Sequence, residues 1–261
     1  RRSIMGILRT DKISGLETPT PVTNSVLFDG TGDYLSIASS SDFTFGTGDF
    51  TVELYVNATN FTNRGTFYDS RAVGGTTGIT IGHEASTGEL RVYMNATSGS
   101  DIIAQSTDFT TDTWYHVAVT RSSGTVRLFI DGILKDSGTR TSDMNNTNAV
   151  NIGYKTYDSS GYDYFSGYVS NFRILKGTAL YTSNFTPSVH ELEVIGDTVL
   201  LCCNNPDSAG ADGTGKTITV NGDAAASTVS PGLTRDFTSG TEFQGVTVFD
   251  TQGYFVPPSG T

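Results

Sequence analysis

A group of aromatic side chains between residues 154 and 168 has the composition of a sugar-binding surface. It contains five tyrosines with two acidic residues among them: Tyr154, Tyr157, Tyr162, Tyr164 and Tyr168, with Asp158 and Asp163. An aromatic face matches the apolar face of a pyranose ring, while acidic and amide groups bond its hydroxyls. Packing within the protein, or against a neighbouring subunit, would use the same residues. We predict a ligand site formed by Tyr154, Tyr157, Asp158, Tyr162 and Asp163.

Histidine and cysteine lack the spacing of a metal or redox site. His83, His116 and His190 lie far apart in the chain, and we expect His116 to be packed or hydrogen-bonded within a sheet. The only two cysteines, Cys202 and Cys203, are adjacent. Alternation along a strand would send one thiol into the core and the other outward, so we expect neither a disulfide nor a redox role.

Composition favours an all-β protein that binds neither nucleic acid nor membrane. Thirty glycines, with abundant Thr, Ser, Tyr and Phe, are typical of strands and tight turns. The net charge of −11, without any cluster of Lys and Arg, argues against a partner with a phosphate backbone. No apolar stretch approaches the roughly 20 residues that a membrane-spanning helix needs.

Short strands separated by glycine turns recur along most of the chain. Residues 50–56 alternate apolar and polar side chains, which predicts one buried face. Residues 113–121, 125–130 and 133–135 are separated by Ser-Ser-Gly and Asp-Gly, and Asp-Gly is a strong hairpin signal. Many strands, spaced about ten residues apart without a helical period, predict an all-β, two-sheet antiparallel jelly-roll sandwich.

The longest predicted strand, residues 165–175, closes the sandwich. Strict alternation would place Tyr168, Ser170, Phe172 and Ile174 on one face, and Val169, Asn171, Arg173 and Leu175 on the other. Gly177 then frees the backbone to turn.

The chain divides into three parts. Residues 1–24 contain Pro19 and Pro21 and suit an extended N-terminal arm, residues 25–204 form the sandwich, and residues 205–261 form a short β-rich C-terminal extension. The extension is too poor in apolar residues for its own core, so we expect it to pack on the sandwich or on a neighbouring subunit. An arm without a core is ordered only when something else holds it, which favours a homo-oligomer.

Five stretches of the predicted sandwich match one family in their sequence and in their order along the chain. They are residues 26–35, 50–56, 114–121, 126–132 and 165–174, and together they resemble the laminin-G-like, concanavalin A-like jelly-roll domains. The resemblance spans about residues 25 to 203 and implies the jelly-roll fold.

The continuation, residues 176–187 followed by residues 197–202, is similar to a subset of these domains found in structural proteins of marine tailed bacteriophages, and residues 5–13 are similar to the starts of such proteins. This implies a non-enzymatic virion surface protein, either a head decoration or a tail or fibre appendage, made in the host cytoplasm without a signal peptide. Its implied partners are other virion proteins or sister subunits, contacted through the arm and the extension. The alternative is an adhesin that binds glycans on the host surface.

The resemblance also implies which chemistry to seek. Calcium is the one cofactor that it implies, with Asp29 and Asp33 as ligands and Asp163 as a weaker candidate, although a glycine turn alone also accounts for the first two. The glycan hydrolases of this fold carry an acid-x-acid-x-acid pattern on one strand. No such triple occurs here; the nearest is Glu191-Leu-Glu193, beside His190. We therefore expect no catalysis.

Overall fold

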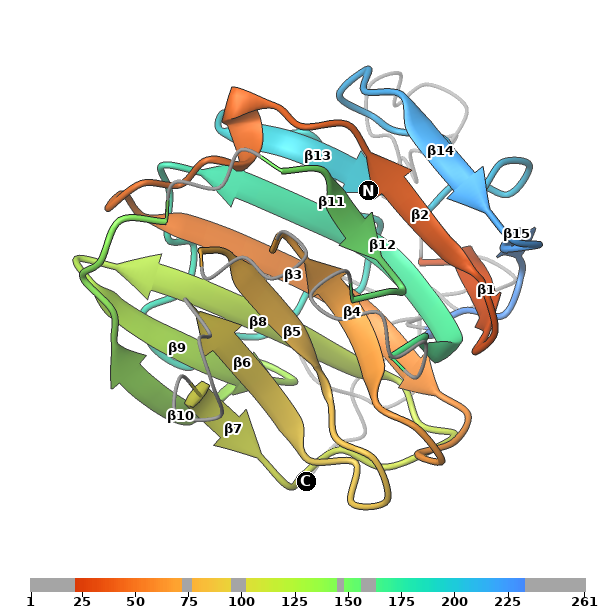
Figure 1. Cartoon of the computed structure of the whole chain (residues 1–261), viewed down its shortest axis with the longest axis horizontal. Helices are drawn as coiled ribbons and strands as arrows, with labels where there is room; N and C mark the ends of the chain where they lie inside the picture. The colour runs from red at the N-terminus through yellow and green to blue at the C-terminus, as the bar shows by residue number, and fades with distance from the viewer. Residues whose placement is uncertain (1–21, 72–76, 95–101, 145–147, 156–162, 233–261) are drawn as a thin grey trace, which may run out of the picture.

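Strands of mostly buried residues build two facing sheets, and residues 50–56 are buried on both faces rather than on the one predicted. The computed structural model describes residues 22–71, 77–94, 102–144, 148–155 and 163–232. In this part of the chain, two antiparallel sheets form a sandwich (Figure 1), which confirms the predicted fold class. The one helical element there is a single 3-10 turn, Ser41–Phe43. No described helix is long and apolar enough to cross a membrane.

Both sheets mix strands from distant parts of the chain. The first sheet has the order β10 (Ile133–Thr139), β9 (Thr125–Ile130), β8 (Tyr115–Ser122), β3 (Phe50–Ala58), β12 (Ser166–Lys176), β1 (Ser25–Asp29) and β15 (Ala225–Ser227), and β13 (Thr198–Cys202) also pairs with β12. The second sheet has the order β14 (Ile218–Asn221), β2 (Tyr34–Ile37), β11 (Val150–Ile152), β4 (Gly65–Asp69), β5 (Ile79–His83), β6 (Leu90–Met94) and β7 (Ile102–Ser106). Figure 1 shows the late strands β14 and β15, in blue, beside the early strands β1 and β2.

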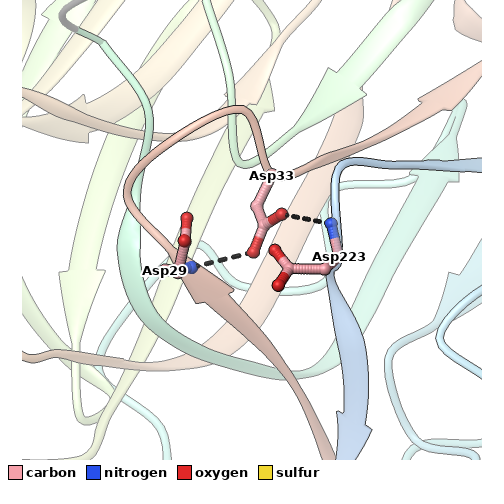
Figure 2. A group of neighbouring side chains, drawn as sticks. All are labelled: Asp29, Asp33 and Asp223. Atoms are coloured by element: carbon pink, nitrogen blue, oxygen red, sulfur yellow. Dashed lines mark hydrogen bonds between the residues drawn. The ribbon is translucent and has the colours of Figure 1, made fainter.

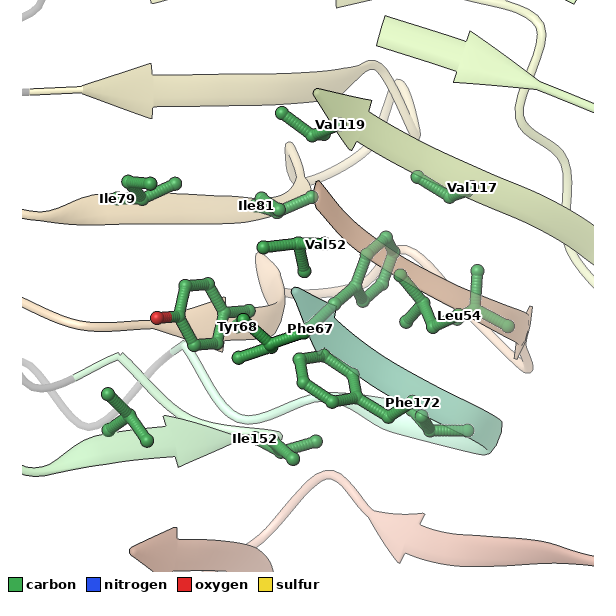
Figure 3. Close-up of a cluster of buried hydrophobic side chains, with 14 of the residues drawn as sticks. Val52, Leu54, Phe67, Tyr68, Ile79, Ile81, Val117, Val119, Ile152 and Phe172 are labelled. Carbon is green, nitrogen blue, oxygen red and sulfur yellow. The ribbon is translucent and has the colours of Figure 1, made fainter. Parts of the chain in front are cut away.

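The core lies between the two sheets (Figure 3). The first sheet contributes Val52, Leu54, Val117, Val119 and Phe172, and the second contributes Phe67, Tyr68, Ile79, Ile81 and Ile152. These side chains are at most 1 % exposed. Close packing of this kind means that even small losses of side-chain volume reduce stability.

The hairpins form where the sequence predicts them. Both central residues of the β8–β9 turn, Ser123 and Gly124, have positive φ angles, and so do Asp131 and Gly132 between β9 and β10. Paired positive φ angles match the twist of adjacent strands and favour glycine at the second position.

Two edge strands were not predicted. β7 lies at one edge of the second sheet and β15 at one edge of the first. Edge strands pair with a neighbour on one side only, and β-propensity is a weaker signal there than in central strands. β14 and β15 also extend both sheets with residues from beyond position 204.

The closing strand β12 does not alternate along its whole length, so the predicted division of its faces is wrong. A bulge between Ser170 and Arg173 interrupts the pairing of β12 with β3, and Asn171 has a φ of 49°. The extra residue shifts the alternation, so Val169 joins Phe172 in the core while Arg173 faces outward.

The cysteine pair also departs from expectation. Cys203 has a φ of 63°, which ends the alternation of β13, and both thiols are buried with their Sγ atoms 3.7 Å apart. The prediction that one thiol points outward is therefore wrong, while both cysteines are free, as expected.

Residues 178–192, called the strap below, cross the outer face of the first sheet. The rings of Tyr181 and Phe185 stack with centroids 3.5 Å apart and meet Phe129 edge-on. The Thr120 hydroxyl donates a hydrogen bond of 2.8 Å to the carbonyl of Tyr181. The segment whose sequence resembles phage structural proteins therefore covers part of the outer face of the first sheet.

Candidate functional site

Three tyrosine rings gather at one end of the second sheet. Tyr34 begins β2, Tyr154 follows β11 and Tyr164 precedes β12. Tyr154 and Tyr164 stack with ring centroids 4.5 Å apart, and the Tyr34 ring lies 5.1 Å from the first and 6.3 Å from the second. All three residues are partly exposed. We call this group the tyrosine platform.

Local packing holds the platform together. The backbone N–H of Phe165 donates to the carbonyl of Gly153 at 2.9 Å, which places the adjacent residues Tyr154 and Tyr164 side by side. Gly153 has a φ of 91°, and a Cβ there would lie 2.8 Å from the ring of Phe28. Only glycine satisfies both constraints, so this turn depends on residue 153 having no side chain.

A cluster of three carboxylates borders the platform, because Asp33 directly precedes Tyr34. Figure 2 shows Asp33 between Asp29 and Asp223. Asp33 accepts hydrogen bonds from the backbone N–H of Asp29 at 3.0 Å and of Asp223 at 2.7 Å. One oxygen from each carboxylate lies within 4.8 Å of the other two. Asp33 is buried, whereas Asp29 and Asp223 are exposed.

The buried carboxyl group of Asp33 lies next to two other carboxylates, which changes its pKa. Burial raises the pKa of Asp33 above its usual value of 3.8, and the adjacent carboxyl of Asp223 raises it further, although two backbone hydrogen bonds oppose the shift. The folded state therefore holds this proton more tightly than the unfolded chain does. As the pH rises from about 3.8 through the raised pKa, Asp33 makes the unfolding free energy smaller.

The fold and its sequence match a known family. The model of Laminin_G_3, described as the concanavalin A-like lectin/glucanases superfamily, matches residues 29–180, more than half of the chain. The chain belongs to this superfamily. No curated protein matches it in sequence.

A solved structure with a TM-score above 0.5 shares the fold of this laminin-G-like domain. A structure from Bacteroides ovatus, named for a proposed carbohydrate-binding role, is 18 % identical with a TM-score of 0.64. The match covers 83 % of this chain and 63 % of the other, so the chain spans less than two thirds of that protein. The heptameric SAP-like pentraxin from Limulus polyphemus is 16 % identical with a TM-score of 0.49, covering 76 % of this chain and 95 % of the other.

The carboxylate cluster of this laminin-G-like domain fits a calcium ion in its donor chemistry. Calcium takes oxygen ligands at about 2.3–2.6 Å, so oxygens that share one ion lie up to about 5 Å apart. The spacing of up to 4.8 Å in the cluster meets that condition. Each oxygen of Asp33 accepts only one backbone hydrogen bond, which leaves it a lone pair for a cation. Asp29, Asp33 and Asp223 would hold the ion.

The structure brings together some of the predicted site residues. Tyr154 lies in the platform, and Asp29 and Asp33 lie together in the carboxylate cluster. Asp163 is buried and forms an ion pair with Lys155, so it ties the two ends of one segment together. The other predicted ligand residues, Tyr157, Asp158 and Tyr162, lie outside the described residues.

The sequence reasoning missed Tyr34 and Asp223. No local sequence pattern relates either residue to the predicted ligand site. β2 pairs with β11 and with β14, which brings Tyr34 to Tyr154 and Asp223 to Asp33. Glu191 and Glu193 lie at the end of the strap and beyond it, and the carboxylate of Glu191 accepts a hydrogen bond from Asn24.

Calcium should stabilise the domain in a pH-dependent way. At ten to a hundred times its Kd, it should raise the Tm by about 3–10 °C at pH 7. The rise should shrink near pH 4, because protons compete for Asp33, whose pKa is raised. Differential scanning fluorimetry with and without CaCl2 measures the rise in Tm at pH 7 and its decrease near pH 4.

Two variants separate this site from general charge effects. Asp223→Asn should weaken the calcium effect, whereas Asp112→Asn removes one exposed charge elsewhere and should preserve it. A calcium response that is the same in both variants, or absent at pH 7, would show that the cluster holds no calcium.

Proposed function

We propose that the protein is a non-enzymatic carbohydrate-binding domain displayed on the surface of a bacteriophage virion. The observation that carries the carbohydrate-binding part is the tyrosine platform. Three partly exposed rings lie within 6.3 Å of one another, and the ring surface that their mutual contacts leave exposed can contact a pyranose ring. The exposed carboxylates of Asp29 and Asp223 lie beside it and supply acceptors for sugar hydroxyls.

Membership of the concanavalin A-like superfamily supports the proposed carbohydrate-binding role. The Bacteroides ovatus protein of the same fold is named for a proposed carbohydrate-binding role. In this chain, calcium at the carboxylate cluster would neutralise charge beside the platform. The site would then accept a saccharide without the repulsion of three adjacent carboxylates.

The described acidic residues favour binding over hydrolysis. Glycoside hydrolysis uses one carboxyl group as a proton donor and a second on the opposite side of the scissile bond. Asp33 is 1 % exposed, and both of its oxygens accept backbone hydrogen bonds, so it is poorly placed to reach a substrate. The carboxylate of Glu191 accepts a hydrogen bond from Asn24.

The geometry of the chain ends supports display on a particle. Ser25 at the start of β1 pairs with Ser227 of β15, so residues 1–21 and 233–261 join the described chain near one edge of the first sheet. The carboxylate cluster lies at the other end of β1, about 13 Å away for four residues of strand. Terminal segments that grip virion proteins or sister subunits would then leave the platform free. Many copies on one particle would turn weak sugar contacts into useful avidity.

A glycan array tests the carbohydrate-binding part. The full chain, with calcium, should bind at least one glycan saturably. Tyr154→Ala and Tyr164→Ala should each weaken that binding about tenfold, because an aromatic contact is worth on the order of 1 kcal/mol. Tyr93→Ala removes another partly exposed tyrosine of the second sheet and should leave binding unchanged.

The array and a particle-labelling experiment separate the two halves of the proposal. Antibody against the chain should label purified virions. Labelling without binding to any glycan would contradict the carbohydrate-binding half and leave the structural role. Glycan binding by a protein absent from particles would contradict the virion half.

A further inference from the structure

A row of uncharged side chains crosses the outer face of the first sheet, at the end that the strap leaves uncovered. Tyr168 of β12 pairs with Leu27 of β1 on one side and with Asn57 of β3 on the other. Trp114 precedes β8, whose first residue pairs with Val56. The neighbours of these residues along their strands face the core, so the row faces outward. We call Leu27, Tyr168, Asn57 and Trp114 the aromatic row.

The row exposes apolar surface that the fold does not use. Leu27 is 37 % exposed, and Tyr168, Asn57 and Trp114 are each partly exposed. The rings of Tyr168 and Trp114 have centroids 6.3 Å apart and are tilted by 41°. They form a shallow, angled surface on either side of Asn57.

The Asn57 amide gives this surface a polar group. Its Oδ1 is buried without a hydrogen-bond partner among the described residues, and the residue as a whole is partly exposed. A buried amide oxygen without a partner costs about 1–3 kcal/mol. The Oδ1 of Asn57 is therefore an acceptor that no described residue uses.

We propose that the aromatic row is a second saccharide-binding site, specific for uncharged sugars. A sugar offers an apolar ring face to the tyrosine and tryptophan rings, and its hydroxyls can satisfy the Asn57 amide. The row carries no charged side chain, although the chain has a net charge of −11, so it suits a neutral saccharide better than an anionic one. It lies on the first sheet, whereas the tyrosine platform lies on the second.

The size of the row favours a small ligand over a protein. A stable protein interface buries about 800 Å² per partner and involves about 20–30 residues on each side. The row has four side chains, and the strap covers the neighbouring outer face around Tyr55 and Thr120. A mono- or disaccharide matches the exposed part of this surface.

Tryptophan fluorescence reports on this site directly, because Trp114 is the only tryptophan in the chain. The full chain is titrated with lactose, cellotriose, maltotriose and chitotriose under selective tryptophan excitation. At least one sugar should change the emission saturably. Tyr168→Ala should raise its Kd about tenfold, and Tyr154→Ala, in the tyrosine platform, should leave it unchanged.

Asn57→Leu is the second variant, and it should also weaken binding about tenfold. Since it removes an amide oxygen without a partner, its Tm should equal or exceed that of the wild type, which separates lost binding from lost folding. The proposal is overturned if no sugar changes the emission, if Tyr168→Ala and Asn57→Leu both bind normally, or if the emission depends on protein concentration, which would assign the row to self-association. Because Tyr154→Ala alters only the tyrosine platform, its result shows whether sugar binding at the aromatic row fails independently of sugar binding at the platform.

Discussion

Glu53→Ala should lower the free energy of unfolding by about 3–5 kcal/mol, because it leaves a buried arginine without its counter-ion. Glu53 lies on β3 under the strap and is fully buried. Its Oε1 accepts two hydrogen bonds from Arg173, from Nε at 2.9 Å and from Nη2 at 2.6 Å. Arg173 is itself 6 % exposed, so the substitution would leave its charge unpaired in a dry environment.

The other oxygen of Glu53 ties neighbouring elements together. Its Oε2 accepts a hydrogen bond from the Tyr181 hydroxyl at 2.8 Å and lies 3.2 Å from Nε2 of His116. Burial alone raises the pKa of Glu53, but His116 and Arg173 outweigh it, and the pKa lies below the usual value of 4.5. The stabilisation from Glu53 is therefore present above pH 4.5 and is lost as the pH falls through the lowered pKa.

Urea unfolding at pH 7 measures the effect, and two further variants test its cause. Glu53→Gln keeps the shape but loses the charge, so it should cost less than Glu53→Ala. The double variant Glu53→Leu with Arg173→Leu should recover much of the loss, because an apolar pair can replace a buried ion pair. A change under about 1 kcal/mol in Glu53→Ala would contradict the view that this group holds the strap.

Arg121→Met should destabilise the protein by about 3 kcal/mol, because it removes the charge-assisted hydrogen bonds that a buried guanidinium donates to the carbonyls of Gly46 and Gly48. Arg121 is fully buried at the end of β8. Its Nε donates to the carbonyl of Gly48 at 2.7 Å, and its Nη2 donates to the carbonyl of Gly46 at 2.8 Å. Its guanidinium also lies 5.2 Å from the centre of the Phe50 ring.

These contacts hold the turn that leads into β3. Methionine keeps most of the volume of arginine, so the loss reports mainly on hydrogen bonds. Arg127→Met is the matched control, since Arg127 is a partly exposed arginine on the neighbouring β9, and it should change stability by at most about 0.5 kcal/mol. Chemical denaturation compares the two. Equal effects would show that Arg121 contributes only packing.

The contacts around Glu53 give a structural role to the strap, the segment that resembles phage proteins. The Tyr55 hydroxyl donates to the carbonyl of Ser188, and Arg173 Nη1 donates to the carbonyl of Glu193 at 2.9 Å. Together with Tyr181, these contacts fasten the strap along its length. The strap covers one part of the outer face of the first sheet. The aromatic row lies on the part of that face that the strap leaves exposed.

The sequence alone determined the features that depend on neighbours along the chain. Alternation in residues 50–56 predicted β3, and Asp131-Gly132 predicted a hairpin, because side-chain direction and turn conformation are set within a few residues. The turn from Asp29 to Asp33 brought two carboxylates together, since its glycines allow the chain to reverse within five residues.

Only the tertiary structure decided which distant residues meet. Asp223 reaches Asp33 across 190 positions, and Tyr34 reaches Tyr154, because of how β2 pairs with β14 and β11. The bulge at Asn171 shows the same limit within one strand. It places Val169 in the core and Arg173 opposite Glu53, since burying Val169 with Phe172 requires one extra residue. Strand pairing and core packing are long-range effects, and they built the candidate sites from residues that the sequence had left unrelated.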